Sequence, residues 1–231
     1  MGLARKIHNL LHLKLGKILM LHRVVDQMGS QPEAPSLEVT VDFFTRSLDA
    51  LLEQRVDFIA IDQVAERLRQ KKQKPFVCFT FDDGYLDTYS KAYPILKERQ
   101  IPFCVYMTRD FYRGDAKPHW SPDAEMMGVD HLLALGADPL CTIGVHTSSH
   151  PHLSKLSEEE QRREIEDCKT DLEQLLGRPI RHLAYPYGDY NYETLQIVRQ
   201  LGFATAVTTS GRNVRNDTQI LELDRITFSE E

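Results

Sequence analysis

The feature that most constrains this chain is the repeated alternation of short apolar runs with segments of helical periodicity. Runs rich in β-branched and aromatic residues, such as 76–81 (FVCFTF) and 141–145 (CTIGV), are typical of buried strands. Segments such as 41–54 and 157–176 carry apolar residues three and four positions apart, as helices do. Strands that alternate with helices favour a mostly parallel sheet. The sequence therefore predicts an α/β fold, and the number of units in one short chain favours a compact barrel over an open sheet.

The remaining elements are expected in the same alternation. Further strands are predicted at 16–25, 58–61, 102–107, 181–185, 203–208 and either 220–223 or 226–228. Further helices are predicted at 62–71 with Asp62 as N-cap, at 88–99 with an early interruption by Pro94, and at 192–201. Residues 109–123 are expected to form one long polar and aromatic loop, and a loop of that length in a compact domain is often functional.

Length and composition fit one domain and exclude several classes of function. A chain of 231 residues buries most of its unfolded surface without disulfides. Its net charge of −6 opposes sequence-independent binding to nucleic acid or to an anionic membrane. No apolar run approaches the roughly 20 residues of a membrane span. Cys78, Cys104, Cys141 and Cys168 form no CxxC pair, so we expect reduced, buried cysteines and no thiolate zinc site.

The beginning of the chain is basic and partly apolar. Residues 1–15 are interpreted as an N-terminal amphipathic segment, and residues 16–231 as the single folded domain. By default the stretch 3–15 packs on the bottom of the barrel, with docking to a membrane or a partner as alternatives. Because no apolar core precedes a cleavage site, the sequence as given predicts a cytoplasmic protein. An exported chain trimmed of its signal has the same pattern. The oligomeric state is not readable.

Metal-binding and acid–base side chains follow the predicted strands, where ligand sites of α/β folds lie. Asp82 and Asp83 follow the strand 76–81, and two adjacent carboxylates do not both ionise comfortably without a compensating cation. His146 and His150 follow the strand 141–145, and both imidazoles face one ion if their loop forms one helical turn. Two histidines and one carboxylate suit a catalytic divalent ion, commonly zinc. The alternatives are a solvated turn with Asp83 as a helix cap, and loop histidines that only form hydrogen bonds.

A third polar segment is 184–190 (AYPYGDY). A proline between tyrosines at the end of a strand predicts a rigid, extended wall whose backbone N–H groups face a developing oxyanion. The alternative is an aromatic turn that packs on the core.

Together these segments resemble the polysaccharide deacetylase family, the NodB-homology carbohydrate esterases. Residues 80–85 (TFDDGY) look like its first motif, 146–150 (HTSSH) like its second, and 185–188 (YPYG) like a variant of its third. The joint occurrence of the first two is highly specific. The resemblance extends from about residue 16 to the last strand, which is most of the chain.

The resemblance implies a distorted (β/α)7 barrel in a single domain. It also implies a divalent metal held by Asp83, His146 and His150, with Asp82 as the catalytic base. Zinc is favoured, although nickel, cobalt and iron accept the same ligands. The implied reaction removes an N-acetyl, or less often an O-acetyl, group from a sugar. The implied partner is an acetylated amino-sugar polymer or oligosaccharide.

The chain departs from the family pattern at two positions. Ala184 stands where the third motif commonly carries an arginine that orients the base, and Arg225 is a candidate to supply that guanidinium. No histidine follows His182, so the usual histidine acid of the last motif is missing. Residues 19–24 (LMLHRV) resemble the opening strand of a permuted subgroup that acts on poly-N-acetylglucosamine, which implies His22 as the acid. The alternative is a histidine bonded to the backbone at the end of the barrel.

Aromatic side chains in the loops predict a sugar-binding groove. The predicted substrate contacts are Tyr85, Trp120, Tyr187 and Arg225, and the wider set of groove candidates adds Tyr112, His119 and Tyr190. The alternative for each aromatic residue is ordinary packing. Two other functions stay open: a metal-dependent amidohydrolase that acts on a small cyclic amide, and a non-catalytic carbohydrate-binding module.

Overall fold

The computed structural model describes residues 16–29, 37–54, 56–70, 74–215 and 217–230. The predicted amphipathic segment 1–15 lies outside these residues. None of the helices in the described ranges combines the length and the apolar composition that crossing a bilayer requires.

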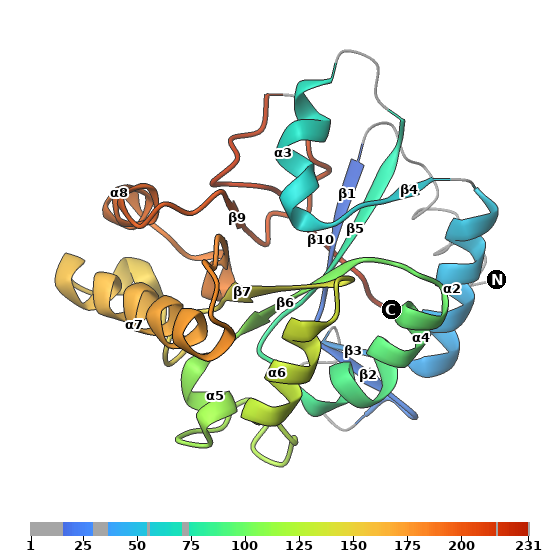
Figure 1. Ribbon diagram of the computed structural model, residues 1–231, viewed down its shortest axis with the longest axis horizontal. Helices are drawn as coiled ribbons and strands as arrows, with labels where there is room; N and C mark the ends of the chain where they lie inside the picture. Colours follow the sequence, from blue (N-terminus) through green and yellow to red (C-terminus); the bar gives the residue numbers. More distant parts are fainter. Residues whose placement is uncertain (1–15, 30–36, 55, 71–73, 216, 231) are drawn as a thin grey trace.

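A parallel sheet forms the centre of the molecule (Figure 1). Its strands run in the order β10-β1-β5-β6-β7-β8-β9, and neighbouring strands in this order are parallel. They are β1 (Gly16–Leu21), β5 (Phe76–Phe81), β6 (Phe103–Met107), β7 (Cys141–Val145), β8 (His182–Ala184), β9 (Thr205–Val207) and β10 (Ile226–Thr227). The short strand β4 (Asp57–Phe58) pairs with the first two residues of β5.

The C-terminal segment connects the two ends of this sheet. Leu223 forms a parallel bridge with Val207 of β9. A few residues later β10 pairs with Leu19 and Met20 of β1. The sheet therefore curls into a distorted barrel, and the predicted α/β barrel fold is confirmed.

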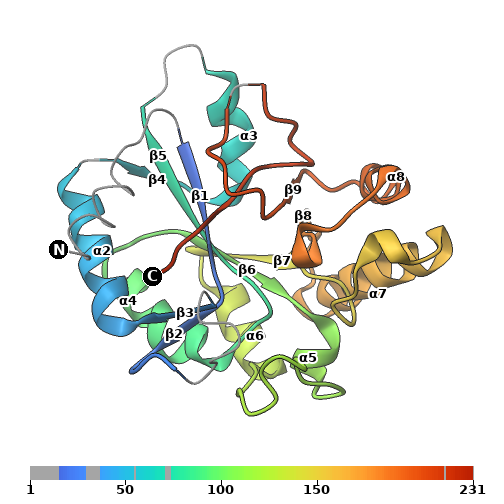
Figure 2. The same cartoon turned by 180° about the vertical axis from the view of Figure 1, so that it is seen from behind.

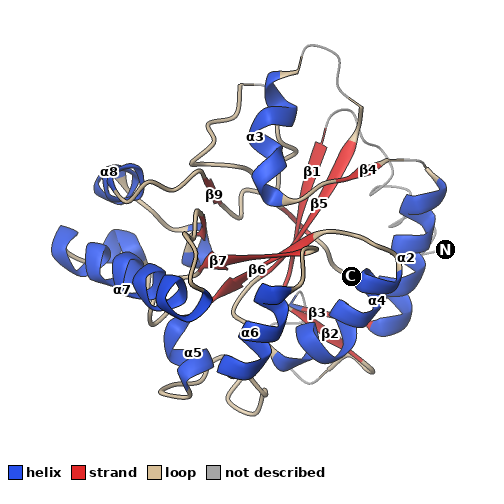
Figure 3. Cartoon of the chain, viewed as in Figure 1, coloured by secondary structure: helices blue, strands red, loops and turns tan. Residues whose placement is uncertain are grey.

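Helices surround the strands, as the two opposite views show (Figures 1 and 2) and as the colouring by secondary structure makes plain (Figure 3). They are α2 (Val41–Glu53), α3 (Ile61–Arg69), α4 (Tyr93–Glu98), α5 (Arg109–Arg113), α6 (Val129–Ala137), α7 (Glu158–Leu176) and α8 (Tyr192–Gln200). The longest of them, α7, begins with a capping box between Ser157 and Glu160 and ends at Gly177, whose φ of 63° suits glycine.

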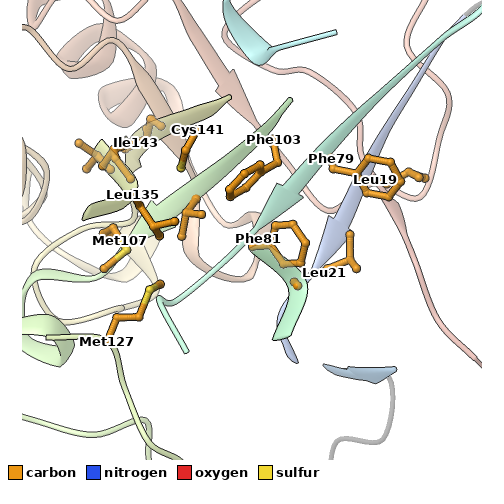
Figure 4. Packing of buried hydrophobic residues seen from close by; sticks show 14 of the residues in the cluster. Leu19, Leu21, Phe79, Phe81, Phe103, Met107, Met127, Leu135, Cys141 and Ile143 are labelled. Carbon is orange, nitrogen blue, oxygen red and sulfur yellow. The ribbon is translucent and has the colours of Figure 1, made fainter. Parts of the chain in front are cut away.

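Alternate residues of β5 face two different apolar clusters. Phe79 and Phe81 belong to the cluster between the sheet and the outer helices (Figure 4). There Phe44 of α2 meets both rings edge-on, with centroid distances of 6.1 and 6.2 Å. Cys78 points the other way and belongs to a second cluster with Val64 of α3. A strand buried on both faces has an unbroken apolar sequence, which explains why it could be predicted.

Two predictions about the first half of the chain are wrong. The predicted strand 16–25 divides at His22, because β2 (Arg23–Val25) leaves β1 and pairs with β3 (Glu38–Thr40) in a separate sheet. Asp62 does not cap α3. The helix begins at Ile61 after Ala60, whose N–H donates to the Gln63 side chain, so Asp62 lies in the first turn.

The predictions for residues 88–137 also need correction. Residues 88–99 begin with a π-helical turn (Thr88–Ala92) and continue directly as α4, with Pro94 in the first turn of α4. The predicted loop 109–123 begins with α5, and α6 was not predicted. The expectation of free, buried cysteines is confirmed for all four.

Candidate metal centre and active site

The predicted polar groups meet at the carboxyl ends of neighbouring strands. His22 follows β1, Asp82 and Asp83 follow β5, and His146 follows β7. The strands β1 and β5 are in register, with Leu21 beside Phe81, so His22 and Asp82 leave the sheet at the same level. Residues that are distant in sequence therefore share one end of the barrel.

Asp83, His146 and His150 form a compact set of donor atoms. Asp83 Oδ1 lies 3.4 Å from His146 Nε2 and 3.5 Å from His150 Nε2. One donor atom from each residue lies within 4.8 Å of the others, and all three residues are buried. Among the described residues, neither carboxylate oxygen of Asp83 has a hydrogen-bond partner. A buried carboxylate without partners is costly, and a divalent cation bound by two imidazoles and a carboxylate removes that cost, so the donor set fits a metal ion.

The orientation of His146 is set by a backbone carbonyl. Its Nδ1 lies 2.8 Å from the carbonyl oxygen of Ala184, which only accepts, so Nδ1 carries the proton and donates. The lone pair of Nε2 then faces Asp83. Metal-binding histidines typically donate their second ring N–H in this way. The sequence did not predict this role for Ala184, because a carbonyl contact leaves no signature in residue type.

The loop after β7 does not form the predicted helical turn. Thr147 and His150 have φ values of 64° and 62°, in the left-handed region, so the chain winds back and brings the second imidazole to the first. Glu164 of α7 holds the loop by accepting bonds from the N–H and the hydroxyl of Ser149. Non-glycine residues in this region store strain, and such strain is common at functional sites.

The turn after β5 needs glycine at its third position. Asp83 has a φ of 70° and Gly84 a φ of 85°. A Cβ at Gly84 would lie 2.8 Å from the Cε atom of Met107. The turn folds Asp83 inward to a fully buried position, so the predicted alternative of a solvated turn is wrong.

Asp82 is held by a buried arginine. Arg225 donates from Nη1 and Nη2 to the two carboxylate oxygens, at 2.7 and 2.6 Å. Its Nε donates to the carbonyl of Thr208, and Nη1 also donates to the hydroxyl of Thr80. Arg225 is completely buried, so the predicted contact with substrate is wrong. Its guanidinium instead orients the Asp82 carboxylate, which the methyl side chain of Ala184 could not do.

The two adjacent carboxyl groups have opposite electrostatics. Burial raises the pKa of Asp82, but the positive charge of Arg225 and the nearby histidines outweigh it and hold that pKa well below its ordinary value. Burial raises the pKa of Asp83 well above its ordinary value, and the charge of Asp82 adds to the effect. Asp82 is therefore ionised by its protein partners, whereas the ionised form of Asp83 needs a cation.

His22 lies beside the ionised aspartate. Its Nε2 is 4.0 Å from Asp82 Oδ2, and its side chain keeps 13% of its surface exposed. Burial lowers the pKa of His22 to about 4, against the opposing effect of Asp82. Its Nδ1 is buried and has no hydrogen-bond partner among the described residues, so that atom does not make the backbone bond of the alternative interpretation.

Aromatic rings surround His150. The rings of Trp120 and Tyr187 each have their centroid 4.6 Å from that of the imidazole. Tyr187 is 42% exposed and Trp120 is half-buried, which leaves both accessible to a sugar. Tyr85 is completely buried and accepts a hydrogen bond from the Trp120 indole at 2.9 Å, so its predicted contact with sugar is wrong and it supports Trp120 instead.

The other aromatic candidates differ in how close they lie to the site and in what they contact. His119 remains near the site, with its ring centroid 4.7 Å from that of Trp120. Tyr112 is buried and donates to Asp171 of α7. Tyr190 is half-buried and donates to Glu222.

Two polar hollows adjoin these rings. One of about 570 Å³ is lined by residues that include Trp120, His119, Arg23 and Asp87. The other, of about 470 Å³, is lined by residues that include Gly188, Thr209, Arg212 and Asp224. Trp120 lines the first hollow, and Gly188, the residue after Tyr187, lines the second.

Buried charges beside His22 were also missed by the sequence prediction. Arg23 pairs with Asp87 at 2.8 Å and with the buried Glu38 at 3.2 Å. The only sequence signal is that Asp87 follows the aspartate motif within the same segment, and such a signal does not distinguish it from a surface residue.

Comparison with known proteins assigns the chain to a family. The model of the polysaccharide deacetylase family matches residues 69–206. A putative polysaccharide deacetylase of Bacillus subtilis, YxkH, is 28% identical over 160 residues, which cover 69% of this chain and 54% of that protein. The chain thus spans about half the length of this relative.

Two further comparisons cover nearly the whole chain. A poly-β-1,6-N-acetyl-D-glucosamine N-deacetylase of Staphylococcus aureus is 21% identical over 227 residues, 94% of this chain and 77% of that protein. The structure of the Streptococcus pyogenes deacetylase PplD in complex with acetate superimposes with a TM-score of 0.80 at 26% identity, over 94% of both chains. The matched family model includes both the aspartate and the histidine motif, and this chain belongs to the polysaccharide deacetylase family.

Proposed function

We propose that this chain is a metal-dependent hydrolase that removes N-acetyl groups from the amino sugars of a polysaccharide or oligosaccharide and releases acetate. The observation that carries the proposal is the convergence of Asp83, His146 and His150 beside the Arg225–Asp82 pair. The name of the S. aureus relative supports a polymer of N-acetylglucosamine as the substrate class.

Asp83, His146 and His150 would hold the metal through one carboxylate and two Nε2 atoms. A divalent ion bound there supplies Lewis acidity, which lowers the pKa of water and polarises an acyl carbonyl. We propose zinc, and the same ligand set accepts nickel, cobalt or iron.

Asp82 is proposed as the general base. Its carboxylate lies next to the ligand residue Asp83 in the chain, and Arg225 fixes both of its oxygens. It takes a proton from the water that attacks the acetamide carbonyl, and its low pKa keeps it ionised for that role. The Tyr187 backbone N–H is proposed to face the developing oxyanion.

His22 is proposed as the general acid. When protonated, its imidazolium donates to the nitrogen of the departing amino sugar, so the products are acetate and a free amine. The nearby Asp82 carboxylate favours the protonated form, while burial opposes it and makes the imidazolium a stronger donor.

The substrate is proposed to lie across Trp120 and Tyr187. Both side chains keep part of their surface exposed, and aromatic rings suit stacking on sugar rings. The hollow of about 570 Å³ beside Trp120 and the hollow of about 470 Å³ beside Gly188 have room for sugar units, which supports a polymer or oligosaccharide over a small cyclic amide.

The proposal is tested by metal analysis and acetate release on one protein preparation. The full chain is treated with a chelator, reloaded with zinc and incubated with an oligomer of N-acetylglucosamine. We expect about one zinc per chain, acetate release that depends on zinc, and loss of both in His146→Ala. Zinc binding without acetate release would favour a binding module, and acetate release unaffected by the chelator would exclude the metal-dependent mechanism.

A further inference from the structure

No hydrogen bond to Nδ1 holds the imidazole of His22, the proposed acid, in place among the described residues. That atom of His22 is buried without a hydrogen-bond partner in the described part of the chain. Its Nε2 lies 4.0 Å from the Asp82 carboxylate, beyond a direct hydrogen bond. The position of the imidazole therefore depends strongly on the backbone that carries it.

That backbone lies at a break between two sheets. Residue 22 separates β1, which belongs to the barrel, from β2, which pairs with β3. The barrel register ends at Leu21. The conformation at His22 must therefore be fixed by contacts from outside the barrel sheet.

Two consecutive residues after β5 make such contacts. Asp87 Oδ1 accepts from the Val24 N–H at 3.2 Å, and the Thr88 hydroxyl donates to the His22 carbonyl at 3.3 Å. They stand at the start of the π-helical turn Thr88–Ala92, and π-helical turns occur frequently at functional sites. The β2–β3 sheet lies beside this segment in both views (Figures 1 and 2).

A buried ion-pair network holds Asp87 in place. Its Oδ2 accepts from Arg23 Nε at 2.8 Å, and Arg23 Nη1 donates to Glu38 at 3.2 Å. Glu38 is 1% exposed and Asp87 is 9% exposed. Removal of one partner from a buried pair leaves an uncompensated charge, so the network is a rigid support.

We propose that Asp87 is a positioning residue for His22. Its carboxylate accepts hydrogen bonds from the Arg23 side chain and the Val24 N–H, and these bonds fix the backbone that holds the imidazole beside the leaving amine. The inference rests on the proposed role of His22 as general acid. Asp87 is not expected to touch the metal or the reacting atoms. It acts by limiting the displacement of His22, and a misplacement of about 1 Å can lower a rate by about 10²-fold.

The test is a double-mutant cycle on the zinc-loaded full chain. Acetate release from an N-acetylglucosamine oligomer is measured for the wild type, Asp87→Asn, His22→Ala and the double variant. We expect Asp87→Asn to lower kcat by about 10–10²-fold, with zinc affinity within about twofold of the wild type. In the His22→Ala background, Asp87→Asn should change kcat by less than about twofold, because no imidazole remains to be positioned.

Two further variants separate positioning from general stability. Thr88→Val removes the hydroxyl bonded to the His22 carbonyl without changing the shape of the side chain, and it should reproduce a smaller decrease in kcat. Asp57→Asn is the matched control, because Asp57 also pairs with an arginine at 2.8 Å but lies in β4, beside the first residue of β5 and so at the opposite end of that strand from the site. It should leave kcat unchanged.

The outcomes distinguish this inference from the function on which it rests. An equal loss of kcat from Asp87→Asn with and without His22 would overturn the positioning role while leaving His22 as the acid. A parallel loss of zinc affinity would assign Asp87 to the support of the metal ligands and would also overturn it. Full activity of His22→Ala would refute the acid role itself.

Discussion

Two buried polar clusters lie side by side in the candidate site, and they differ in whether protein groups satisfy the carboxylate of each. In the arginine cluster, Arg225 satisfies Asp82, Thr80 and the Thr208 carbonyl with its own donors. In the ligand cluster of Asp83, His146 and His150, the carboxylate has no hydrogen-bond partner among the described residues. In the arginine cluster, protein groups alone satisfy the charge and the hydrogen bonds of Asp82. The ligand cluster instead has the donor set of a cation site.

Residues that are adjacent in the sequence can therefore have opposite functions. Asp82 and Asp83 differ by one position and both are buried, yet the pKa of the first is lowered and that of the second is raised. The left-handed φ of Asp83 turns its side chain away from Arg225 and toward the imidazoles. One turn thus separates a proposed base from a proposed ligand.

The largest expected effect comes from removing the charge of Asp82. Asp82→Asn should lower kcat for acetate release by about 10²–10⁴-fold, the usual contribution of a general base. Zinc content per chain should stay unchanged, because the ligand cluster is intact. His150→Ala is the control that should lose zinc. If Asp82→Asn loses zinc to the same extent, the arginine cluster is needed for metal binding and the two clusters do not have separate functions.

The next effect concerns stability. Arg225→Met keeps much of the side-chain volume but leaves the Asp82 carboxylate buried without its partner, so the free energy of unfolding should fall by about 3–5 kcal/mol. The combination with Asp82→Asn should recover a large part of that loss. Urea unfolding measures both. A double variant as unstable as Arg225→Met alone would show that Arg225 acts through packing and not through its ion pair.

The elements that carry these clusters were largely predictable. The strands before Asp82 and before His146 are buried on both faces, and their continuous apolar sequences 76–81 and 141–145 match β5 and β7 residue for residue. Convergence at one end of the barrel then follows from parallel strand order. The residue types Asp and His indicated metal chemistry because few other roles need them together at that end.

What could not be predicted depends on contacts between distant residues. Arg225 and Asp82 are 143 residues apart, and no local pattern connects them. The break at His22 was missed because apolar residues continue from β1 into β2 although the pairing partner changes. The left-handed residues Thr147 and His150 were missed because their side chains do not require that conformation. Tertiary contacts impose these features.

Metal binding should stabilise the folded chain, and this stabilisation should depend only on the ligand cluster. At a zinc concentration of about 100 times Kd, the chelator-treated wild type should gain about 2.7 kcal/mol in the free energy of unfolding, because the ion binds the folded state. Asp82→Asn should gain as much as the wild type, since its ligands are unchanged. His146→Ala should gain little. Equal stabilisation of all three proteins would place the bound zinc elsewhere on the chain.

The smallest expected effect is the pH dependence of the ligand cluster without metal. The folded state raises the pKa of Asp83 above its ordinary value of 3.8, so the folded protein holds a proton that the unfolded chain releases, and stability falls as pH rises through that interval. Asp83→Asn removes this penalty. In the presence of a chelator it should be more stable than the wild type near pH 7 by about 1–2 kcal/mol, a modest value because the buried carboxyl can take up a proton instead. The advantage should shrink as pH falls toward 4, where the Asp83 carboxyl of the unfolded wild type also begins to take up a proton. Urea unfolding between pH 4 and pH 8 measures the difference in the free energy of unfolding between Asp83→Asn and the wild type. Glu164→Gln, which changes a carboxylate that holds the loop of His150, controls for general pH effects. An advantage that grows toward low pH would reverse the assigned electrostatics of the two aspartates.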